Sequence, residues 1–548
     1  MPGTLIVILK SEGAPLAPIQ AVLPQGAELE RLFPTAGDSA AEMFEARFYK
    51  VSHVADASLS PLASTLREQR ETLNIDAAYV TPQAQPASMG TRVPSVRPWP
   101  VPRDGAADPT PPFDGLQGYL GAPPNGINAR WAWDQEGGKG DHIIVTDIEF
   151  AWNSQHEDLN GRISGSSPDG TGGTTDLREY ESHGTAVAGI LVGRHSAGPT
   201  ERGIKGICPE IDLRMLSIDQ STSAEAIKRA REEKPPPDII LVELQRAGPP
   251  EGEDDPEGED DPRLEAMSYL PLEWWPEDWV QVYLATKAGI IVVAAAGNGA
   301  QNLRDDARFD YIIGNAPPGT YPTGWANPFK RLNSGAPPSA PPYYSPQWTD
   351  CGSILVGAGA PPPDNLFATT LRPARSRLRF SNYGRKVNRD EEGRVVSVEQ
   401  GNVDVQAWGR LVVTTGYGDL QSEALPNVLT EPVLPPDPRR AVWTGTPDGP
   451  PLRSNFDLTS SRNHTWYTKK FSGTSSAAAI VAGALACAQG IRKTTGSPLI
   501  PATARAQLRA SGIATSLTKQ TPGPGELLGP TGVVTVDPIG GSPDISGI

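Results

Sequence analysis

The sequence predicts an α/β protein in which a mostly parallel sheet lies between layers of helices, preceded by a small α+β domain. Two observations lead to this fold class. Short, nearly continuous apolar segments rich in Val and Ile alternate with helical segments after about residue 115, which is typical of a parallel sheet covered on both faces. The chain also has 548 residues, which is long for one domain and suits a large unit plus an accessory one.

The first domain is expected at 1–82 and the large domain at 115–548, with a Pro/Gly-rich linker at 83–114. Proline in the linker blocks both helix and ladder formation. Within the first domain, the order of apolar and helical segments suits a small sheet with two helices on one face. The predicted elements are a strand at 5–10, a helix at 26–33, a strand at 44–51, a helix at 61–73 and a strand at 76–82.

The large domain alternates strands and helices. Strands are predicted at 142–147, 211–218, 238–244, 290–297 and 353–360, and helices at 183–193, 222–234, 276–289 and 475–492. Thr222 and Glu225 have the spacing of a capping box, and Pro276 suits the first turn of its helix. Long Pro/Gly-rich inserts near 246–275, 299–345 and 425–460 are expected on the surface.

Composition excludes several classes of function. The formal net charge is −16, and eight acidic residues lie in 251–262, so the rest of the chain carries −8. Without a basic stripe to contact phosphates, nucleic-acid binding is not expected. Three widely spaced cysteines, Cys208, Cys351 and Cys487, fit neither a disulfide framework nor a metal motif, so free thiols are expected.

The sequence shows neither a signal peptide nor a membrane span. The apolar run near the N-terminus has no basic segment before it and no cleavage site after it. The longest apolar runs are shorter than the roughly 18 residues that a spanning helix needs. We therefore expect a cytoplasmic protein, or one exported without a recognisable signal peptide.

Candidate catalytic groups stand at the ends of these elements, where function gathers in parallel sheets. Asp147 ends one strand, another runs into Asn298, and His183 and Ser475 each open a helix. A serine hydroxyl becomes a nucleophile when an imidazole takes its proton and a carboxylate orients that imidazole. The helix N-terminus and the Asn298 amide could then stabilise an oxyanion. The alternative for Ser475 is a simple N-cap of a small-residue core helix.

Four motifs resemble those of the subtilisin-like serine peptidases, in the order Asp, His, Ser that is typical of the family. They are IIVTDIEFAWNSQHEDL around Asp147, SHGTAVAGI around His183, VVAAAGN ending at Asn298 and FSGTSSAAAIVAG around Ser475. The resemblance implies a serine endopeptidase that acts on protein or peptide substrates through an acyl-enzyme on Ser475. His183 would be the base, Asp147 its orienting carboxylate and Asn298 an oxyanion donor. No cofactor is expected.

The chain departs from the family pattern at two motifs. The family usually has Asp-Ser/Thr-Gly where this chain has Asp147, Ile148 and Glu149, and proline where Ala479 stands. These departures leave open a catalytically weak or inactive relative that serves as a binding module. A non-peptidase acyl hydrolase is a third interpretation, but the Gly-x-Ser-x-Gly motif and Ser-first order are missing.

Substrate is expected to bind extended along Glu243 and Leu244 and against Ala296 and Gly297, because an extended peptide needs a strand edge and small neighbours. Glu243 has two interpretations. It could be a solvated glutamate at a strand end, or it could face the substrate and, with the acidic tract, favour a basic side chain before the scissile bond.

The family resemblance also bears on metal binding and on the N-terminal domain. Asp158 matches an aspartate that helps to hold calcium in many relatives, but the loop at 194–203 lacks the expected partner oxygens, so no metal is predicted. In element order and position, the first domain resembles the family's propeptides. We therefore expect a zymogen whose own N-terminal domain inhibits it.

Overall fold

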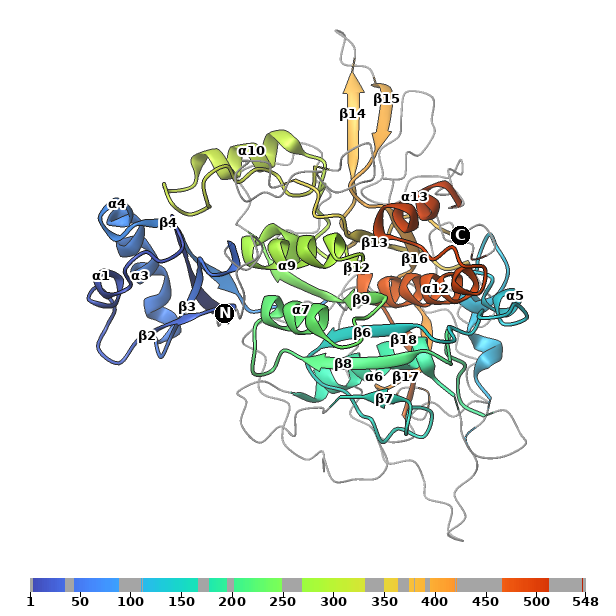
Figure 1. The fold of residues 1–548 in the computed structure, drawn as a ribbon. Coiled ribbons are helices and arrows are strands. Elements are labelled where there is room, and N and C mark those ends of the chain that lie inside the picture. Colours follow the sequence, from blue (N-terminus) through green and yellow to red (C-terminus); the bar gives the residue numbers. More distant parts are fainter. Residues whose placement is uncertain are drawn as a thin grey trace, which may run out of the picture.

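A central parallel sheet organises the large domain (Figure 1). The computed structural model describes residues 3–34, 44–87, 110, 112–165, 177–194, 202–248, 269–330, 349–362, 374–378, 380–389, 395–418, 420, 466–511 and 545. The sheet has seven strands in the order β16-β13-β12-β9-β6-β8-β7, and its strand pairs are parallel. Its strands are β6 (Ile144–Glu149), β7 (Ile163–Ser164), β8 (Asp212–Ser217), β9 (Ile239–Val242), β12 (Ile291–Ala295), β13 (Ile354–Gly359) and β16 (Val405–Trp408). The expected parallel α/β fold is confirmed.

Helices cover the two faces of the sheet (Figure 1). Alternate residues of one strand face opposite sides, so Leu241 packs in the core with α6 (Leu177–Val192) and α12 (Thr474–Thr494), whereas Val242 packs in the core with α7 (Ser223–Glu232) and α9 (Pro276–Lys287). The predicted capping box of Thr222 and Glu225 begins α7, and Pro276 begins α9.

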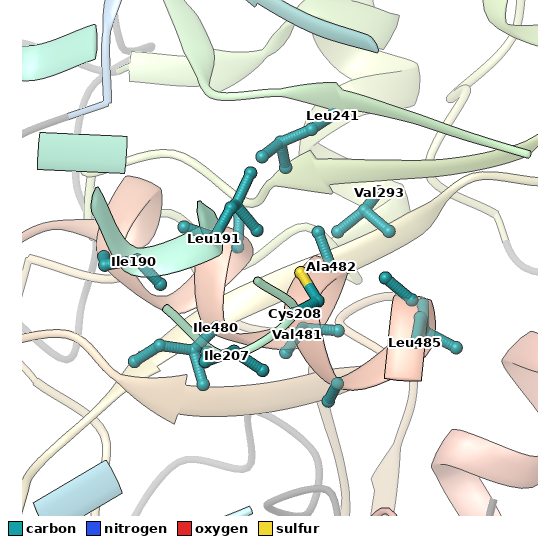
Figure 2. Packing of buried hydrophobic residues seen from close by; sticks show 14 of the residues in the cluster. Ile190, Leu191, Ile207, Cys208, Leu241, Val293, Ile480, Val481, Ala482 and Leu485 are labelled. Atoms are coloured by element: carbon teal, nitrogen blue, oxygen red, sulfur yellow. The ribbon is translucent and has the colours of Figure 1, made fainter. Parts of the chain in front are cut away.

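Helix α12 lies in the middle of one core. Figure 2 shows its Val481 and Ala482 against Leu241 and Val293 of the sheet and Leu191 of α6. The helix is long and apolar enough to cross a membrane, but 94% of its apolar window is buried inside the protein. That burial is the environment of a core helix. Its small side chains allow the close packing, since a Cβ on Gly483 would lie 2.9 Å from Ile207.

The N-terminal domain is an antiparallel sheet with helices on one face. The strand order is β2-β3-β1-β4, formed by β1 (Gly3–Leu9), β2 (Glu28–Arg31), β3 (Phe48–Ser52) and β4 (Ile75–Pro82). The helices are α1 (Ala17–Gln20), α3 (Asp56–Glu68) and α4 (Arg70–Leu73). The helix predicted at 26–33 is wrong: this segment contains β2, which pairs with β3. Tertiary pairing overrides the helical preference of Glu, Leu and Arg there.

The other face of this small sheet packs against the large domain. Ile6, Phe48 and Tyr79 share a core with α7 and α9 of the large domain. Buried Glu45 accepts hydrogen bonds from Lys228 Nζ (3.1 Å), Arg231 (2.7 Å) and Gln281 (2.8 Å) of the large domain. The segment after α10 (Asp306–Asn315) adds a further contact, because Ala78 N donates to Gly319 O at 2.8 Å.

Two predicted boundaries differ from the structure. Helix α6 begins at Leu177, so His183 lies inside the helix and does not open it. The strand predicted at 238–244 divides at Glu243: β9 belongs to the central sheet, and β10 (Leu244–Ala247) joins a small separate sheet with β11 (Tyr269–Pro271) and β5 (Gln85–Pro86). The remaining short elements are the 3-10 turns at Asp114–Leu116, Gly118–Leu120 and Leu272–Trp274, α5 (Ala129–Ala132), α10 (Asp306–Asn315) and α13 (Pro501–Ser511). Two antiparallel strand pairs complete the list: β14 (Arg385–Arg389) with β15 (Val395–Gln400), and β17 (Val412–Thr415) with β18 (Tyr467–Phe471).

Candidate active site

Glu149 orients the candidate base. Its Oε1 lies 2.6 Å from His183 Nδ1, and both side chains are buried. A carboxylate can only accept, so His183 carries its proton on Nδ1 in this contact and Nε2 has a free lone pair. Nε2 has no hydrogen-bond partner among the described residues. The edge of the Phe471 ring packs against the imidazole, with the ring centroids 5.4 Å apart. His183 is therefore held in the tautomer that a general base requires.

Asp147 does not make the contact predicted for it. It is fully buried, and neither of its carboxyl oxygens has a hydrogen-bond partner among the described residues. Asp147 and Glu149 are two residues apart on β6, so both point to the α6 face, but the longer and later side chain is the one that reaches His183. Burial, and next the charge of Glu149, raise the pKa of Asp147 well above its usual range.

Glu243 adds a third carboxyl group to those of Asp147 and Glu149. It follows β9, next to β6, and its carboxyl, the carboxyl of Glu149 and the imidazole of His183 offer ligand atoms all within 4.8 Å of one another. Burial, followed by the charges of Asp147 and Glu149, raises the pKa of Glu243 well above its usual range. Neither interpretation of Glu243 from the sequence matches this placement. Its carboxyl is not solvated, and it faces other carboxyl groups and His183.

Ser475 lies at the start of α12, next to this cluster. Gly473, with a φ of 108°, precedes the helix and lets the chain turn from β18 into it. The Ser475 hydroxyl is buried and donates to the carbonyl oxygen of Glu243 at 3.2 Å. Glu243 is thus next to both residues: its backbone carbonyl accepts from the Ser475 hydroxyl, and its carboxyl lies within 4.8 Å of the His183 imidazole. The hydroxyl is not hydrogen-bonded to His183 in this conformation.

Asn298 supplies a free amide donor. Its Oδ1 accepts from both the backbone N–H and the hydroxyl of Thr474, each at 2.9 Å, which fixes the orientation of the amide. The amide nitrogen is buried and has no hydrogen-bond partner among the described residues. An unpaired buried donor costs stability, and this one is oriented and available to a ligand oxygen.

A peptide segment of the chain itself lies at Ser475. The backbone N–H of Ser475 donates to Ala87 O at 3.1 Å, and Ala87 N donates to Glu243 O at 2.8 Å. Just before Ala87, β5 pairs antiparallel with β10, with Pro86 opposite Leu244 and Gln85 opposite Gln245. The carbonyl of Ala87 therefore accepts from the Ser475 N–H, one of the two candidate oxyanion donors, and not from the Asn298 amide nitrogen. The predicted linker at 83–114 thus begins as an extended segment in the site, and residues 88–109 lie outside the described part of the chain.

The other expected substrate-binding residues surround this segment. Leu244 lies on β10 and shares a buried core with Ala84. Ala296 follows β12 and is buried, and Gly297 has a φ of 92°, which favours glycine. The Gly297 N–H donates to the hydroxyl of Thr474 at 3.1 Å, so this turn and the start of α12 support each other.

The prediction that no metal binds near Asp158 concerns a loop that lies partly outside the described residues. Asp158 is buried and accepts from Ile204 N at 2.9 Å, but 195–201 of the partner loop lie outside the described residues. Within the described residues, Glu28, Glu30 and His53 form a second group with ligand atoms within 4.8 Å of one another. It lies in the N-terminal domain, and Glu28 and His53 are exposed.

Sequence reasoning missed two parts of this site. Glu149 stands out in the sequence only as a departure from the family pattern, although the two-residue period of a strand puts it on the same face as Asp147. Ala87 and the three residues before it belong to a segment that composition assigns to a linker. An Ala-Gln-Pro-Ala sequence carries no signal of its own, and only pairing with β10 gives it structure.

The fold and the site together define a serine peptidase of the subtilisin type: a parallel sheet between helices, with the serine at the N-terminus of a buried helix and the histidine on another. The chain belongs to the subtilase family, whose model matches residues 138–529. No curated protein matches the chain significantly.

Two solved structures are similar to this chain. A protease from Pseudoalteromonas arctica is 16% identical over 80% of this chain and 98% of its own, with a TM-score of 0.42. Fervidolysin, a keratinolytic enzyme from Fervidobacterium pennivorans, is 14% identical over 100% of this chain and 60% of its own, with a TM-score of 0.46.

Proposed function

We propose that this subtilase is a serine endopeptidase, made as a zymogen, whose catalytic residues are Ser475, His183 and Glu149. The observation that carries the proposal is the position of the Ala87 carbonyl, which accepts the backbone N–H of Ser475. A peptide carbonyl at a serine beside a buried histidine is the arrangement that acyl transfer requires.

The proposed reaction follows from these groups. Ser475 Oγ attacks the carbonyl carbon of the scissile bond while His183 Nε2 takes the hydroxyl proton. The Ser475 N–H and the Asn298 amide then stabilise the negative oxygen. His183 gives its proton to the leaving amine, and water hydrolyses the acyl-enzyme with His183 again acting as base. Glu149 holds the Nδ1 proton and stabilises the imidazolium.

Asp147 and Glu243 act in their neutral forms in this proposal. Three ionised carboxylates in one buried cluster would repel each other, and burial raises the pKa of Asp147 and of Glu243, which favours the neutral form of each. Glu149, which faces His183, then remains the acceptor. This assignment moves the orienting role from Asp147, where the family resemblance implies it, to Glu149.

The docked N-terminal domain supports the zymogen proposal. Tyr79 and Thr81 on β4 both donate to buried Glu277 of α9 at 2.6 Å, and β4 leads directly into the segment that ends at Ala87 in the active site. The domain thus holds a substrate-like segment against Ser475. We propose that it inhibits the enzyme until the chain is cut after Ala87.

A fluorophosphonate probe and N-terminal sequencing test this function. The processed wild-type protein should be labelled and should begin at Ser88, whereas Ser475→Ala should be unlabelled and remain full length. His183→Ala should also lose nearly all peptidase activity, because triad residues act as a unit.

The alternative is a binding module without peptidase activity. The observation that favours it is that the Ser475 hydroxyl donates to Glu243 O while His183 Nε2 has no partner among the described residues. Folded wild-type protein that is neither labelled nor processed, and cleaves no peptide, would support this alternative and exclude the enzyme.

A further inference from the structure

Gln245 bridges the two sides of the site beside Ala87. Its side chain is buried, and its Oε1 accepts the backbone N–H of Asn298 at 2.7 Å. Gln245 lies on β10, which carries the substrate-like segment, and Asn298 follows β12. The side-chain amide therefore spans from one strand to the other. Its Nε2 also donates to Pro86 O at 3.4 Å, a long contact with the segment itself.

Ala87 is completely buried next to this bridge. It is 0% exposed and belongs to the core that contains Ala295 and Ala477. Its backbone is fixed on both sides, because its N–H donates to Glu243 O and its carbonyl accepts from Ser475 N. A larger side chain at this position cannot move outward without breaking one of these two hydrogen bonds, and interiors packed at crystal density tolerate added volume poorly.

Glu243 and Gln245 both contact the substrate-like segment. The backbone carbonyl of Glu243 accepts from Ala87 N, and Gln245 pairs with Gln85, two residues before Ala87. The Gln245 side chain is held by the backbone N–H of Asn298, the residue whose amide nitrogen is the proposed oxyanion donor. Displacing Gln245 to admit a large residue would leave the buried Asn298 N–H without its acceptor, which costs free energy.

We propose that Gln245 restricts this peptidase to substrates with a small residue, such as Ala, Gly or Ser, immediately before the scissile bond. The inference rests on the proposed peptidase function and specifies its substrate class. It also replaces the expectation of a basic residue at this position, because the Glu243 carboxyl faces Asp147, Glu149 and His183. The preceding positions add selectivity: Ala84 is buried with Leu244 and Leu270, and the Tyr269 hydroxyl donates to Gln85 Oε1 at 2.9 Å.

A peptide series tests this inference. The full-length protein is expressed and allowed to process itself, and the resulting enzyme is given peptides with the sequence Ala-Gln-Pro-X-Ser, in which X is Ala, Gly, Leu, Phe or Lys. The value of kcat/KM is measured for each peptide. Ala and Gly should exceed Leu, Phe and Lys by roughly five- to 150-fold, the range expected for overpacking with one large side chain. A wild-type enzyme that cleaves after Phe, Leu or Lys as well as after Ala would overturn the inference.

The variant Gln245→Ala tests whether Gln245 causes the preference for small residues. The variant should raise kcat/KM for Leu and Phe relative to Ala by at least about tenfold, while the same substitution at exposed Gln220 should leave the ratios unchanged. A Gln245→Ala enzyme with the wild-type preference would overturn the role of Gln245. If that variant does not fold, the wild-type series still decides whether small residues are required.

The two proposals fail in different ways. Fluorophosphonate labelling is measured in the same samples. Labelled wild-type protein that prefers a large residue contradicts only the specificity, whereas protein that is unlabelled and cleaves none of the peptides contradicts the peptidase function and the specificity with it.

Discussion

Glu149 and His183 form a buried pair in which Oε1 and Nδ1 lie 2.6 Å apart. Asp147, two residues earlier on the same strand, points to the same face and has no hydrogen-bond partner among the described residues. Glu149 therefore makes the contact with the imidazole that the family motif would assign to Asp147.

The first prediction separates Glu149 from Asp147. Glu149→Gln should lower kcat by about 10³–10⁴, the effect of replacing the orienting carboxylate in other serine peptidases, because the amide can favour the wrong tautomer of His183. Asp147→Asn should keep activity within about tenfold, since the amide resembles the protonated carboxyl in shape. Rates of peptide hydrolysis at saturating substrate measure both. The reverse ranking of the two variants would return the orienting role to Asp147.

The second prediction concerns stability and pH. The pKa of Asp147 is raised in the folded protein, mainly by burial. As the pH rises above about 4, the unfolded chain therefore loses this proton before the folded one does, and the free energy of unfolding falls. Asparagine does not ionise, so Asp147→Asn removes this fall in the free energy of unfolding. The melting temperature of the variant minus that of its parent should therefore increase as the pH is raised from about 4 to about 8.

The melting temperatures are measured in a Ser475→Ala background, which prevents self-digestion. Asp310→Asn, at an exposed position, is the control and should show a much smaller change with pH. A difference between Asp147→Asn and its parent that stays constant over this pH range would show that Asp147 is not protonated in the fold.

The third prediction tests the oxyanion donor. Asn298→Ala should lower kcat by about 10²–10³ with little change in KM, which is the effect of removing the oxyanion-hole asparagine from subtilisin itself. The reason is that the amide meets a charge that develops only in the transition state. Asn298→Ala also removes the acceptor for Thr474, so circular dichroism should first establish that the variant is folded. A change mainly in KM would instead assign Asn298 to ground-state binding.

The fourth prediction concerns inhibition by the N-terminal domain. Tyr79 donates to Glu277 across the interface at 2.6 Å, so Tyr79→Phe should weaken the inhibition. A hydrogen bond contributes about 0.5–1.5 kcal/mol to a neutral partner and about 1.5–3 kcal/mol to a charged one, so above about pH 7, where Glu277 is ionised, its loss should raise the inhibition constant of the 1–87 fragment by about tenfold or more. Tyr49→Phe, the same change in the core of that domain, is the control. Equal inhibition constants for the two variants would show that the Tyr79 contact does not hold the domain.

Glu277 at the same interface predicts how inhibition by the N-terminal domain changes with pH. Burial, and then the charge of Asp278, raise the pKa of Glu277 to about 7 in the docked state. Undocking exposes this carboxyl and lets its pKa fall, so protons favour the docked state and the inhibition should weaken as the pH rises towards and through about 7. Glu277→Gln should flatten this dependence.

Local patterns in the sequence were enough to predict the five inner strands of the central sheet and the helices between them, but not the two edge strands, β7 and β16. Apolar strands and helical segments differ in period, and residues such as Thr222 and Pro276 mark where helices begin. Local patterns also pointed to Asn298 and Ser475, since Ala-Gly and Gly-Thr-Ser mark turns at element ends. They pointed to His183 as well, although the Gly-Thr that follows it lies inside α6. Each of these signals depends on residues within a few positions of one another.

Long-range packing determined which carboxylate serves His183, where Ala87 lies and what Gln245 bridges. Each of these contacts joins residues far apart in the chain, and none has a local period or cap to reveal it. The helix predicted at 26–33 failed for the same reason, because pairing with β3 outweighs a small intrinsic preference. Side-chain reach also matters: Glu149 and Asp147 share a face of β6, and only the packing of α6 against that strand selects between them.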